Sequence, residues 1–142
     1  MTLARFTRPV AVVTEQDTVA HAARVMRDRR VGCLIVTRDG RPSGLVTDRD
    51  LVVRVVAEGH DPATATLKAF LTYDPITVSV HDGIETAVEH MRRHGIRRLP
   101  IVDDEGHAIG VVTADDLLVL LGGEIAAVCE GIENRADAED SR

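Results

Sequence analysis

The residues best suited to chemistry are a threonine and an aspartate that follow a glycine at one spacing in two places. The pattern is Gly44-x-x-Thr47-x-x-Asp50 and again Gly110-x-x-Thr113-x-x-Asp116. The glycine allows a tight turn, the aliphatic pair after it favours a buried strand, and the apolar run after the aspartate favours a helix. A helix start offers unpaired N–H groups and positive dipole charge, which suit an anion such as phosphate. The alternative is that the threonine and aspartate only cap the helix.

Composition excludes several classes of protein. Of the 142 residues, 44% are hydrophobic and 2% are aromatic, so the core must be aliphatic and base-stacking platforms are missing. The formal net charge is −6, and residues 124–142 hold six acidic and two basic residues, which leaves a nearly neutral body. This balance argues against nucleic acid as a partner. Arginines do form two local clusters. Favourable positive charge at the solvated C-terminal end of a helix would also explain such clusters. Their members are Arg24, Arg27, Arg29 and Arg30, then Arg92, Arg93, Arg97 and Arg98.

Other constellations of reactive side chains are incomplete. His90 and His94 share a helical face, but no third metal ligand stands at a recognisable spacing. Asp48 with Asp50, Asp103-Asp104 and Asp115-Asp116 could hold Mg²⁺ brought in by a nucleotide, or serve in turns and caps. No Walker loop, GxGxxG or GxSxG motif occurs. We therefore expect no enzyme, no catalytic residue, no required cofactor and no resident metal.

The cysteines and the apolar runs bear on location. Cys33 and Cys129 show no CxxC spacing, and no signal peptide or apolar run of membrane length is present. We expect a reduced cytoplasmic protein that makes no membrane contact. A disulfide between the two cysteines is the alternative.

Two halves repeat the same order of predicted elements at an offset of about 65 residues. Each half predicts strand, helix, strand, strand, helix, which indicates an α/β (α+β) fold with the halves packed as a pseudo-twofold pair around a shared core. We expect the first repeat at residues 1–60 and the second at 66–123, with the last helices ending near Gly59 and Gly122-Gly123. Residues 124–142 would form a short helix followed by a disordered acidic tail from Glu133.

The two copies together resemble a tandem pair of the CBS domain family, also called a Bateman module. The resemblance covers residues from about 3 to 122 and rests on both glycine–threonine–aspartate motifs, on Ile96-Arg97-Arg98-Leu99-Pro100 and on the openings Thr7…Pro9 and Thr72…Pro75. In size, the chain is similar to stand-alone bacterial pairs, the hypoxic response type among them. The family implies a cleft between the repeats that accepts AMP, ADP, ATP or S-adenosylmethionine.

The resemblance also implies which residues line that cleft. Asp50 and Asp116 would receive ribose hydroxyls, because an ionised carboxylate only accepts hydrogen bonds. Arg97 and Arg98 would contact phosphate. The first repeat has Gly32-Cys33 at those positions, so we expect a phosphorylated ligand at the site of the second repeat, the one with Thr113 and Asp116. The implied binding residues are Thr72, Ile76, Thr77, Val78, Ile96, Arg97, Arg98, Thr113 and Asp116, with Thr7, Val12, Val31, Thr47 and Asp50 from the first repeat.

The expected function is that of a non-catalytic regulatory module that binds an adenosine-containing ligand and signals through an unknown protein partner. We expect a homodimer formed through helices, with the apolar runs Leu51–Val56 and Leu117–Leu121 as contact faces. The alternative is a ligand-free scaffold that dimerises and binds protein.

Overall fold

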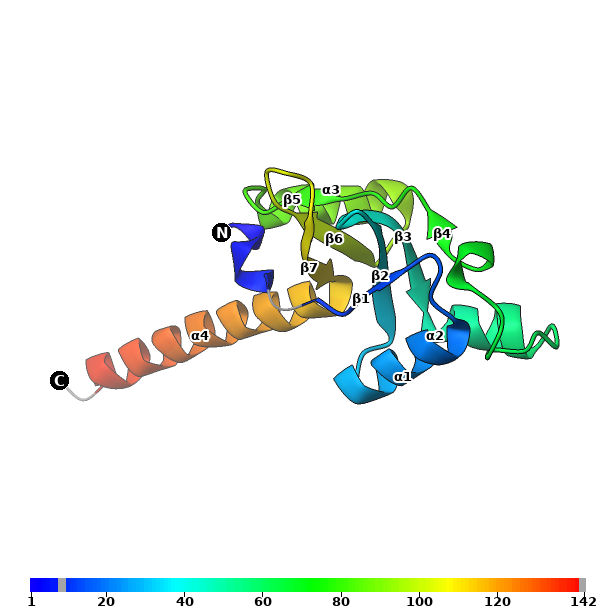
Figure 1. The fold of residues 1–142 in the computed structure, drawn as a ribbon. Helices are drawn as coiled ribbons and strands as arrows, with labels where there is room; N and C mark the ends of the chain where they lie inside the picture. Colours follow the sequence, from blue (N-terminus) through cyan, green and yellow to red (C-terminus); the bar gives the residue numbers. More distant parts are fainter. Residues whose placement is uncertain (8–9, 141–142) are drawn as a thin grey trace.

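Two small sheets with flanking helices make up the molecule (Figure 1). The computed structural model describes residues 1–7 and 10–140. Pro9, one of the prolines in the family resemblance, lies outside the described residues. Each half has the predicted order of strand, helix, strand, strand and helix, so the mixed α and β fold is confirmed.

The first sheet has the strand order β1-β2-β3-β4. β1 (Val12–Thr14) is parallel to β2 (Cys33–Arg38), and α1 (Val19–Arg29) supplies the crossover that a parallel pair needs. β3 (Arg41–Thr47) pairs antiparallel with β2 and leads into α2 (Asp48–Asp50), which continues as a π-helical segment, η2 (Leu51–Val56).

The second sheet repeats this arrangement with the strand order β5-β6-β7. β5 (Val78–Ser79) is parallel to β6 (Arg98–Val102), with α3 (Ile84–His94) between them. β7 (Ala108–Thr113) pairs antiparallel with β6, and α4 (Ala114–Asp140) begins directly after it. The threonine of each motif therefore ends a strand, and the aspartate lies in the first turn of the following helix.

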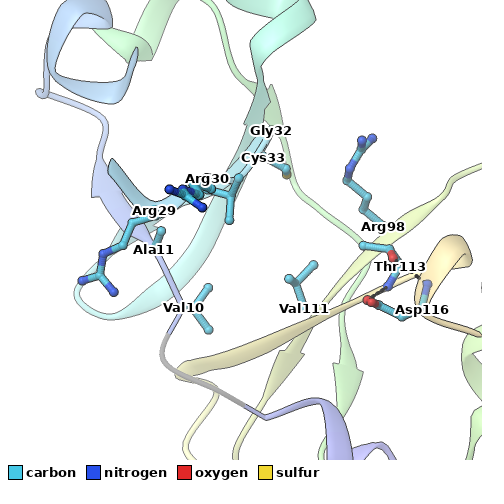
Figure 2. A pocket seen from close by; sticks show the side chains of 11 residues that line it. Val10, Ala11, Arg29, Arg30, Gly32, Cys33, Arg98, Val111, Thr113 and Asp116 are labelled. Carbon is cyan, nitrogen blue, oxygen red and sulfur yellow. Dashed lines mark hydrogen bonds between the residues drawn. The ribbon is translucent and has the colours of Figure 1, made fainter. Parts of the chain in front are cut away.

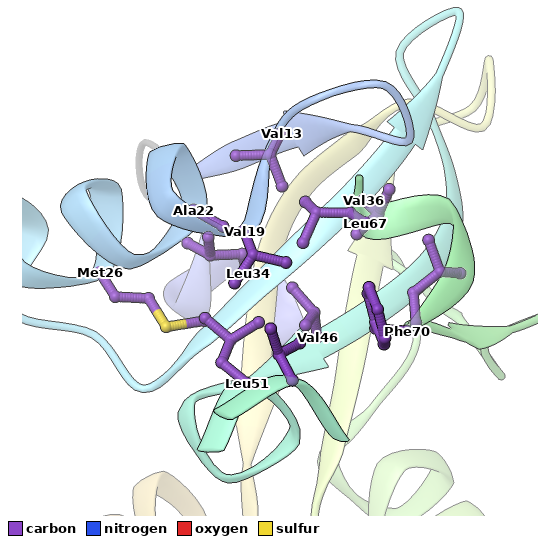
Figure 3. Close-up of a cluster of buried hydrophobic side chains, with 12 residues drawn as sticks. Val13, Val19, Ala22, Met26, Leu34, Val36, Val46, Leu51, Leu67 and Phe70 are labelled. Carbon is purple, nitrogen blue, oxygen red and sulfur yellow. The ribbon is translucent and has the colours of Figure 1, made fainter. Parts of the chain in front are cut away.

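The opening segment of each half packs against the other half. Leu3 and Phe6, in the short 3-10 helix η1 (Leu3–Phe6), belong to the core cluster beside the second sheet. Conversely, η3 (Leu67–Ala69) packs into the first core, and β4 (Thr72–Tyr73) pairs with β3 (Figure 3). The prediction of one shared core was therefore wrong. The residues that the structure describes form two core clusters, and each contains residues of both halves.

This exchange of segments explains the glycine of each motif. A Cβ atom on Gly110 would lie 2.9 Å from the Phe6 carbonyl oxygen, and one on Gly44 would lie 2.7 Å from the Thr72 carbonyl oxygen. Neither glycine has a positive φ. These glycines permit the close approach of the exchanged segment, so the predicted tight turn was wrong.

Helix α4 is longer than the sequence predicts. It runs from Ala114 to Asp140 and passes through Gly122 and Gly123, where we expected it to end. Each glycine weakens a helix by about 1 kcal/mol relative to alanine but keeps its N–H donor, so it does not stop the helix. The segment from Glu133, for which the sequence predicts disorder, is helical as far as Asp140. The bounds of the two repeats and of the tail stay predictions.

After its first turns, α4 leaves the body of the molecule (Figure 1). The apolar side chains that it exposes are Leu118, Val119, Leu121, Ile125, Val128 and Ile132. No helix in the described part of the chain is both long and apolar enough to cross a membrane. Cys33 and Cys129 are both free thiols, so the alternative of a disulfide between them is not realised.

Candidate functional site

A cavity of about 540 Å³ lies between the two halves, and both contribute to its wall. Figure 2 shows the residues just before β1 and the connection between α1 and β2 on one side of the pocket. Strands β6 and β7 and the start of α4 lie on the other side. The lining residues are Val10, Ala11, Arg29, Arg30, Val31, Gly32, Cys33, Arg98, Val111, Thr113 and Asp116. The pocket thus combines apolar side chains, three arginines and one carboxylate.

Thr113 and Asp116 cap the start of α4 at the wall of this pocket. The Asp116 N–H donates to Thr113 Oγ1 at 3.0 Å, and the Thr113 N–H donates to Asp116 Oδ2 at 3.1 Å. This reciprocal arrangement is a capping box. Capping is therefore one role of the motif. A carboxylate offers about four lone-pair sites, so the bond from the Thr113 N–H is compatible with further hydrogen bonds from a ligand.

The first repeat makes the same capping box. Thr47 N–H donates to Asp50 Oδ2 at 2.9 Å, and Asp50 N–H donates to Thr47 Oγ1 at 3.1 Å. Asp50 Oδ1 also lies 3.7 Å from Arg54 Nε. Neither Thr47 nor Asp50 lines the 540 Å³ pocket. The two motifs are thus equivalent in local structure and different in what surrounds them.

The arginines of the Ile96–Pro100 motif have separate positions. Arg98 pairs in register with Thr113 across β6 and β7, which brings its side chain to the pocket. Arg97 instead donates to Asp115 Oδ1 at 2.8 Å in an exposed ion pair, outside the pocket lining. Gly32 and Cys33, the corresponding residues just before β2 and at its start, lie in the same pocket as Arg98. The basic residue missing from the first repeat is therefore supplied by the second.

Cys33 reports on the polarity of the pocket. Burial raises the pKa of the Cys33 thiol to about 11, against a smaller lowering effect of the Arg98 charge. The thiol is neutral at pH 7, so it acts here as a small apolar group and not as a nucleophile.

A second hollow of about 430 Å³ shares Asp116 with the first. It is lined by Arg5, Phe6 and Thr7 of the N-terminal segment and by Asp115, Asp116, Val119 and Leu120 of α4. Thr7 forms a bridge with Gly110, and its hydroxyl donates to the Ala4 carbonyl oxygen at 2.6 Å. Asp116 therefore stands where two hollows and both halves meet.

The structure brings together only some of the residues that the resemblance implied. Val31, Arg98, Thr113 and Asp116 line the larger pocket, and Thr7 lines the second hollow. Val78 is 2% exposed in the second core, with Ile76 and Ile96 packed against that core, so these side chains serve packing. The implied residues outside both hollows are Val12, Thr47, Asp50, Thr72, Ile76, Thr77, Val78, Ile96 and Arg97.

The sequence interpretation missed Arg29 and Arg30 as pocket residues. Both had a signal, because they stand in a local cluster of arginines at the end of α1. Charge at a helix C-terminus is ordinary, however, and the sequence does not show that this end faces the other repeat. Val10, Ala11 and Val111 were missed because apolar residues of strands carry no individual signature.

The histidine pair and the acidic pairs do not form a metal centre in the described part of the chain. The rings of His90 and His94 stack with centroids 5.9 Å apart. No group of three or more His, Cys, Asp or Glu side chains with suitable positions is present among the residues that the structure describes.

Comparison with known proteins agrees with this architecture. The CBS domain model matches twice, at residues 4–57 and 67–123. MK0525 of Methanopyrus kandleri is 37% identical over 112 residues, which cover 78% of this chain and 57% of that protein. Hypoxic response protein 1 of Mycobacterium tuberculosis is 35% identical over 109 residues, or 76% of each chain. The chain therefore spans little more than half of the first relative and about three quarters of the second.

Solved structures of similar proteins have the same fold. The crystal structure of Hypoxic Response Protein I with two coordinated zinc ions has a TM-score of 0.73 at 31% identity and covers 83% of this chain and 97% of its own. The CBS domain protein PAE2072 of Pyrobaculum aerophilum, complexed with AMP, has a TM-score of 0.73 at 30% identity. The match covers 82% of the chain described here and 90% of PAE2072. The chain described here belongs to the CBS domain family and carries two CBS domains in tandem.

Proposed function

We propose that this chain is a non-catalytic regulatory module that binds an adenosine-containing ligand between its two CBS domains. The observation that carries the proposal is the shared pocket, in which Asp116 and Thr113 of one repeat face an apolar wall of the other. Its volume of about 540 Å³ lies within the usual range of small-molecule sites, roughly 300–1,000 Å³. AMP, ADP, ATP and S-adenosylmethionine are the candidate ligands. The solved structure of PAE2072, a protein with the same fold, is a complex with AMP, which supports this class.

The lining suits the parts of such a ligand. Val10, Ala11, Val31 and Val111 offer apolar surface for the flat faces of adenine. The Asp116 carboxylate would accept hydrogen bonds from the ribose hydroxyls, and Thr113 lies beside it at the same helix start. This binding role requires no covalent change of the ligand. The CBS domains occupy residues 4–57 and 67–123, which leaves no room for a catalytic domain within those ranges.

Binding would act on the relation between the repeats. The ligand touches β2 and the end of α1 on one side and β6, β7 and α4 on the other, so it favours the arrangement in which these surfaces face each other. A ligand shifts such an equilibrium only by its difference in affinity for the two states. A protein partner that senses that arrangement would receive the signal. Any Mg²⁺ would arrive with the nucleotide.

A second site related by the internal repeat is part of the same proposal. It would use Thr47 and Asp50 in place of Thr113 and Asp116. Because the Val78 side chain is buried, only the backbone of β5 would contact adenine at the site with Thr47 and Asp50. The remaining candidates for that site are Thr72, Ile76, Thr77, Ile96, Arg97 and Val12.

A scaffold without a ligand is the alternative, and exposed apolar surface favours it. Val52, Val53 and Val56 of η2 are 58%, 47% and 65% exposed, and Leu118 and Val119 of α4 are 65% and 77% exposed. Surface of this kind commonly marks a protein–protein interface. We propose that these faces form a homodimer, which is compatible with ligand binding. A cytoplasmic location, where adenine nucleotides are abundant, belongs to the same proposal.

A thermal-shift series with the full chain tests ligand binding. AMP, ADP, ATP, adenosine and S-adenosylmethionine are each added at increasing concentration while the melting temperature is measured. A ligand present at 100 times its Kd stabilises the folded state by about 2.7 kcal/mol. A rise with at least one adenosine compound supports the sensor. If none raises the melting temperature at millimolar concentration and the chain is a dimer by analytical ultracentrifugation, the scaffold is the better account.

A further inference from the structure

The exposed apolar side chains of α4 recur at the spacing of a coiled coil. Five of them follow one another at intervals of three and four residues in turn, which places them at positions a and d of a heptad. Each of the five is 46–65% exposed. In order along the helix they are Leu118 (a), Leu121 (d), Ile125 (a), Val128 (d) and Ile132 (a). We call this row of side chains the α4 seam.

The described residues of the chain do not cover this seam. Residues 121–132 are all exposed, and Figure 1 shows this stretch of α4 extending away from both sheets. A Cβ atom added to Gly122, Gly123 or Gly131 would meet no atom within 4 Å. Helices in proteins are stabilised mainly by packing of an apolar face, and glycine has a low helix propensity. A continuous helix through three glycines therefore indicates a packing partner from outside the described chain.

The surface of α4 contains a hollow whose lining matches the receiving hole of a coiled coil. Its volume is about 260 Å³, and the residues that line it are Leu121, Glu124, Ile125, Val128 and Cys129. In a coiled coil, each a or d side chain inserts into a hole formed by four residues of the facing helix. The first four lining residues occupy successive d, g, a and d positions, which receive an a side chain when two helices are parallel and in register. At that level, the a residue of a second copy is its own Ile125. The hollow therefore fits the same helix of another copy of this chain.

Charge and side-chain shape favour the same occupant. In a parallel pair, position g of one helix faces position e of the next heptad on the other helix. Glu124, at g, would thus face Cys129, at e, so no two like charges meet across this part of the seam. Glu130 is at position f, away from the seam. β-Branched residues at a with leucine at d favour two strands, and Ile125 and Ile132 at a with Leu121 at d fit that preference.

We propose that the α4 helices of two copies form a parallel, in-register, two-stranded coiled coil along the α4 seam. The CBS model matches only as far as residue 123, so most of this contact lies outside both CBS domains. It is therefore distinct from the dimer face that we propose on η2, and it needs no bound ligand. Asp116 of the inter-repeat pocket lies in the first turn of the same helix, so one continuous element joins the pocket to the contact between copies.

Val128→Glu and Ala127→Glu in the full chain form a matched pair of variants. The first places a carboxylate in the seam, and the second places the same charge one residue away, at an exposed position c. Sedimentation equilibrium gives the dissociation constant of the dimer. We expect Val128→Glu to raise it by roughly 100-fold or more, because a carboxylate from each copy would be buried among apolar side chains. Ala127→Glu should leave it within about threefold of the wild-type value, as is usual for a surface substitution.

Hydrogen exchange and engineered cysteines test the same contact by other means. Amide exchange in residues 121–132 should be slow in wild type and in Ala127→Glu, and faster in Val128→Glu, because the helix loses its packing partner. For the orientation, cysteines are compared in a Cys129→Ser background treated with oxidised glutathione. The d positions of parallel, in-register helices face each other, so Val128→Cys should form a disulfide-linked dimer. Ala127→Cys and the Cys129→Ser parent, which keeps Cys33, should not.

Three results would each overturn the coiled coil. They are a wild-type chain that stays monomeric at every concentration measured, a dissociation constant that Val128→Glu leaves unchanged, and a Val128→Cys variant that cross-links no better than Ala127→Cys. An unchanged dimer in Val128→Glu would place the contact between copies on the CBS domains. Because no ligand takes part in the contact, failure of every adenosine compound to bind would refute the proposed function and leave this inference standing.

Discussion

Asp116→Ala tests two roles of one carboxylate, and Asp50→Ala is its matched control. Each aspartate accepts a hydrogen bond from the threonine N–H of its own motif, at 3.1 Å for Asp116 and 2.9 Å for Asp50. Only Asp116 lines the inter-repeat pocket. Both variants therefore lose the same half of a capping box. Asp50→Ala also loses the weak, partly exposed ion pair with Arg54, and only Asp116→Ala loses a pocket carboxylate.

The magnitudes of the two effects differ enough to be measured separately. Loss of the capping bond costs about 1 kcal/mol, which corresponds to roughly 3–5 °C in Tm for a chain of this size. This cost is modest, so we expect Asp116→Ala to remain folded. A hydrogen bond from a ribose hydroxyl to an ionised carboxylate contributes roughly 1.5–3 kcal/mol. Loss of one such bond weakens binding roughly 10- to 150-fold.

The assay combines urea unfolding without ligand and isothermal titration with AMP. We expect both variants to lose similar stability, and Asp116→Ala alone to lose affinity at the inter-repeat pocket. Wild-type affinity in Asp116→Ala would refute the ribose assignment. An equal loss of affinity at that pocket in Asp50→Ala would show that the effect comes from helix capping and not from a ligand contact.

Three further predictions concern the exchange of segments, the pocket thiol and a buried carboxylate. Gly110→Ala should lower the free energy of unfolding by about 1–3 kcal/mol in urea titrations, because its Cβ would lie 2.9 Å from a carbonyl oxygen of the N-terminal segment. The control Gly122→Ala, where no atom lies within 4 Å of the added Cβ, should not lower the free energy of unfolding. Equal losses of stability in the two variants would contradict this close packing. In a Cys129→Ser background, iodoacetamide should modify Cys33 slowly at pH 7, and the rate should rise about tenfold per pH unit up to the pKa of the Cys33 thiol, about 11. Bound AMP should protect Cys33 from modification. A modification rate that does not change between pH 7 and pH 9 would contradict the burial of this thiol. Glu15 is 3% exposed, and its bidentate hydrogen bond with an arginine lowers its pKa, so its contribution to stability should be complete above the ordinary glutamate pKa of about 4.3 and lost as pH falls through the lower folded-state value. Acid unfolding of Glu15→Gln should lack that component, and an unchanged pH profile would argue against it.

The order of elements could be predicted because the apolar spacing of each half is regular. Val19, Ala22 and Met26 are buried on one face of α1, as the helical period predicts. The exchange of segments could not be predicted from the same pattern. The opening Leu3–Phe6 and its counterpart near Leu67–Phe70 carry similar apolar residues, so each fits the core of either repeat. Only packing decides which core receives which segment.

The candidate site was predictable in its motif and not in its surroundings. Thr113 and Asp116 could be selected because a strand-to-helix junction recurs with the same residue types. Arg97 lies just before β6 and Arg98 is the first residue of that strand, so the two neighbouring side chains have different surroundings. The sequence does not show where the strand begins or which side chain reaches the pocket.

A crystal structure of the full chain with AMP is the most direct measurement of the central claim. We expect the ribose within hydrogen-bond distance of the Asp116 carboxylate, adenine against the apolar wall near Val10 and Val31, and the phosphate beside Arg98. AMP bound away from the gap between the repeats, or a gap that side chains fill when nucleotide is present, would contradict it.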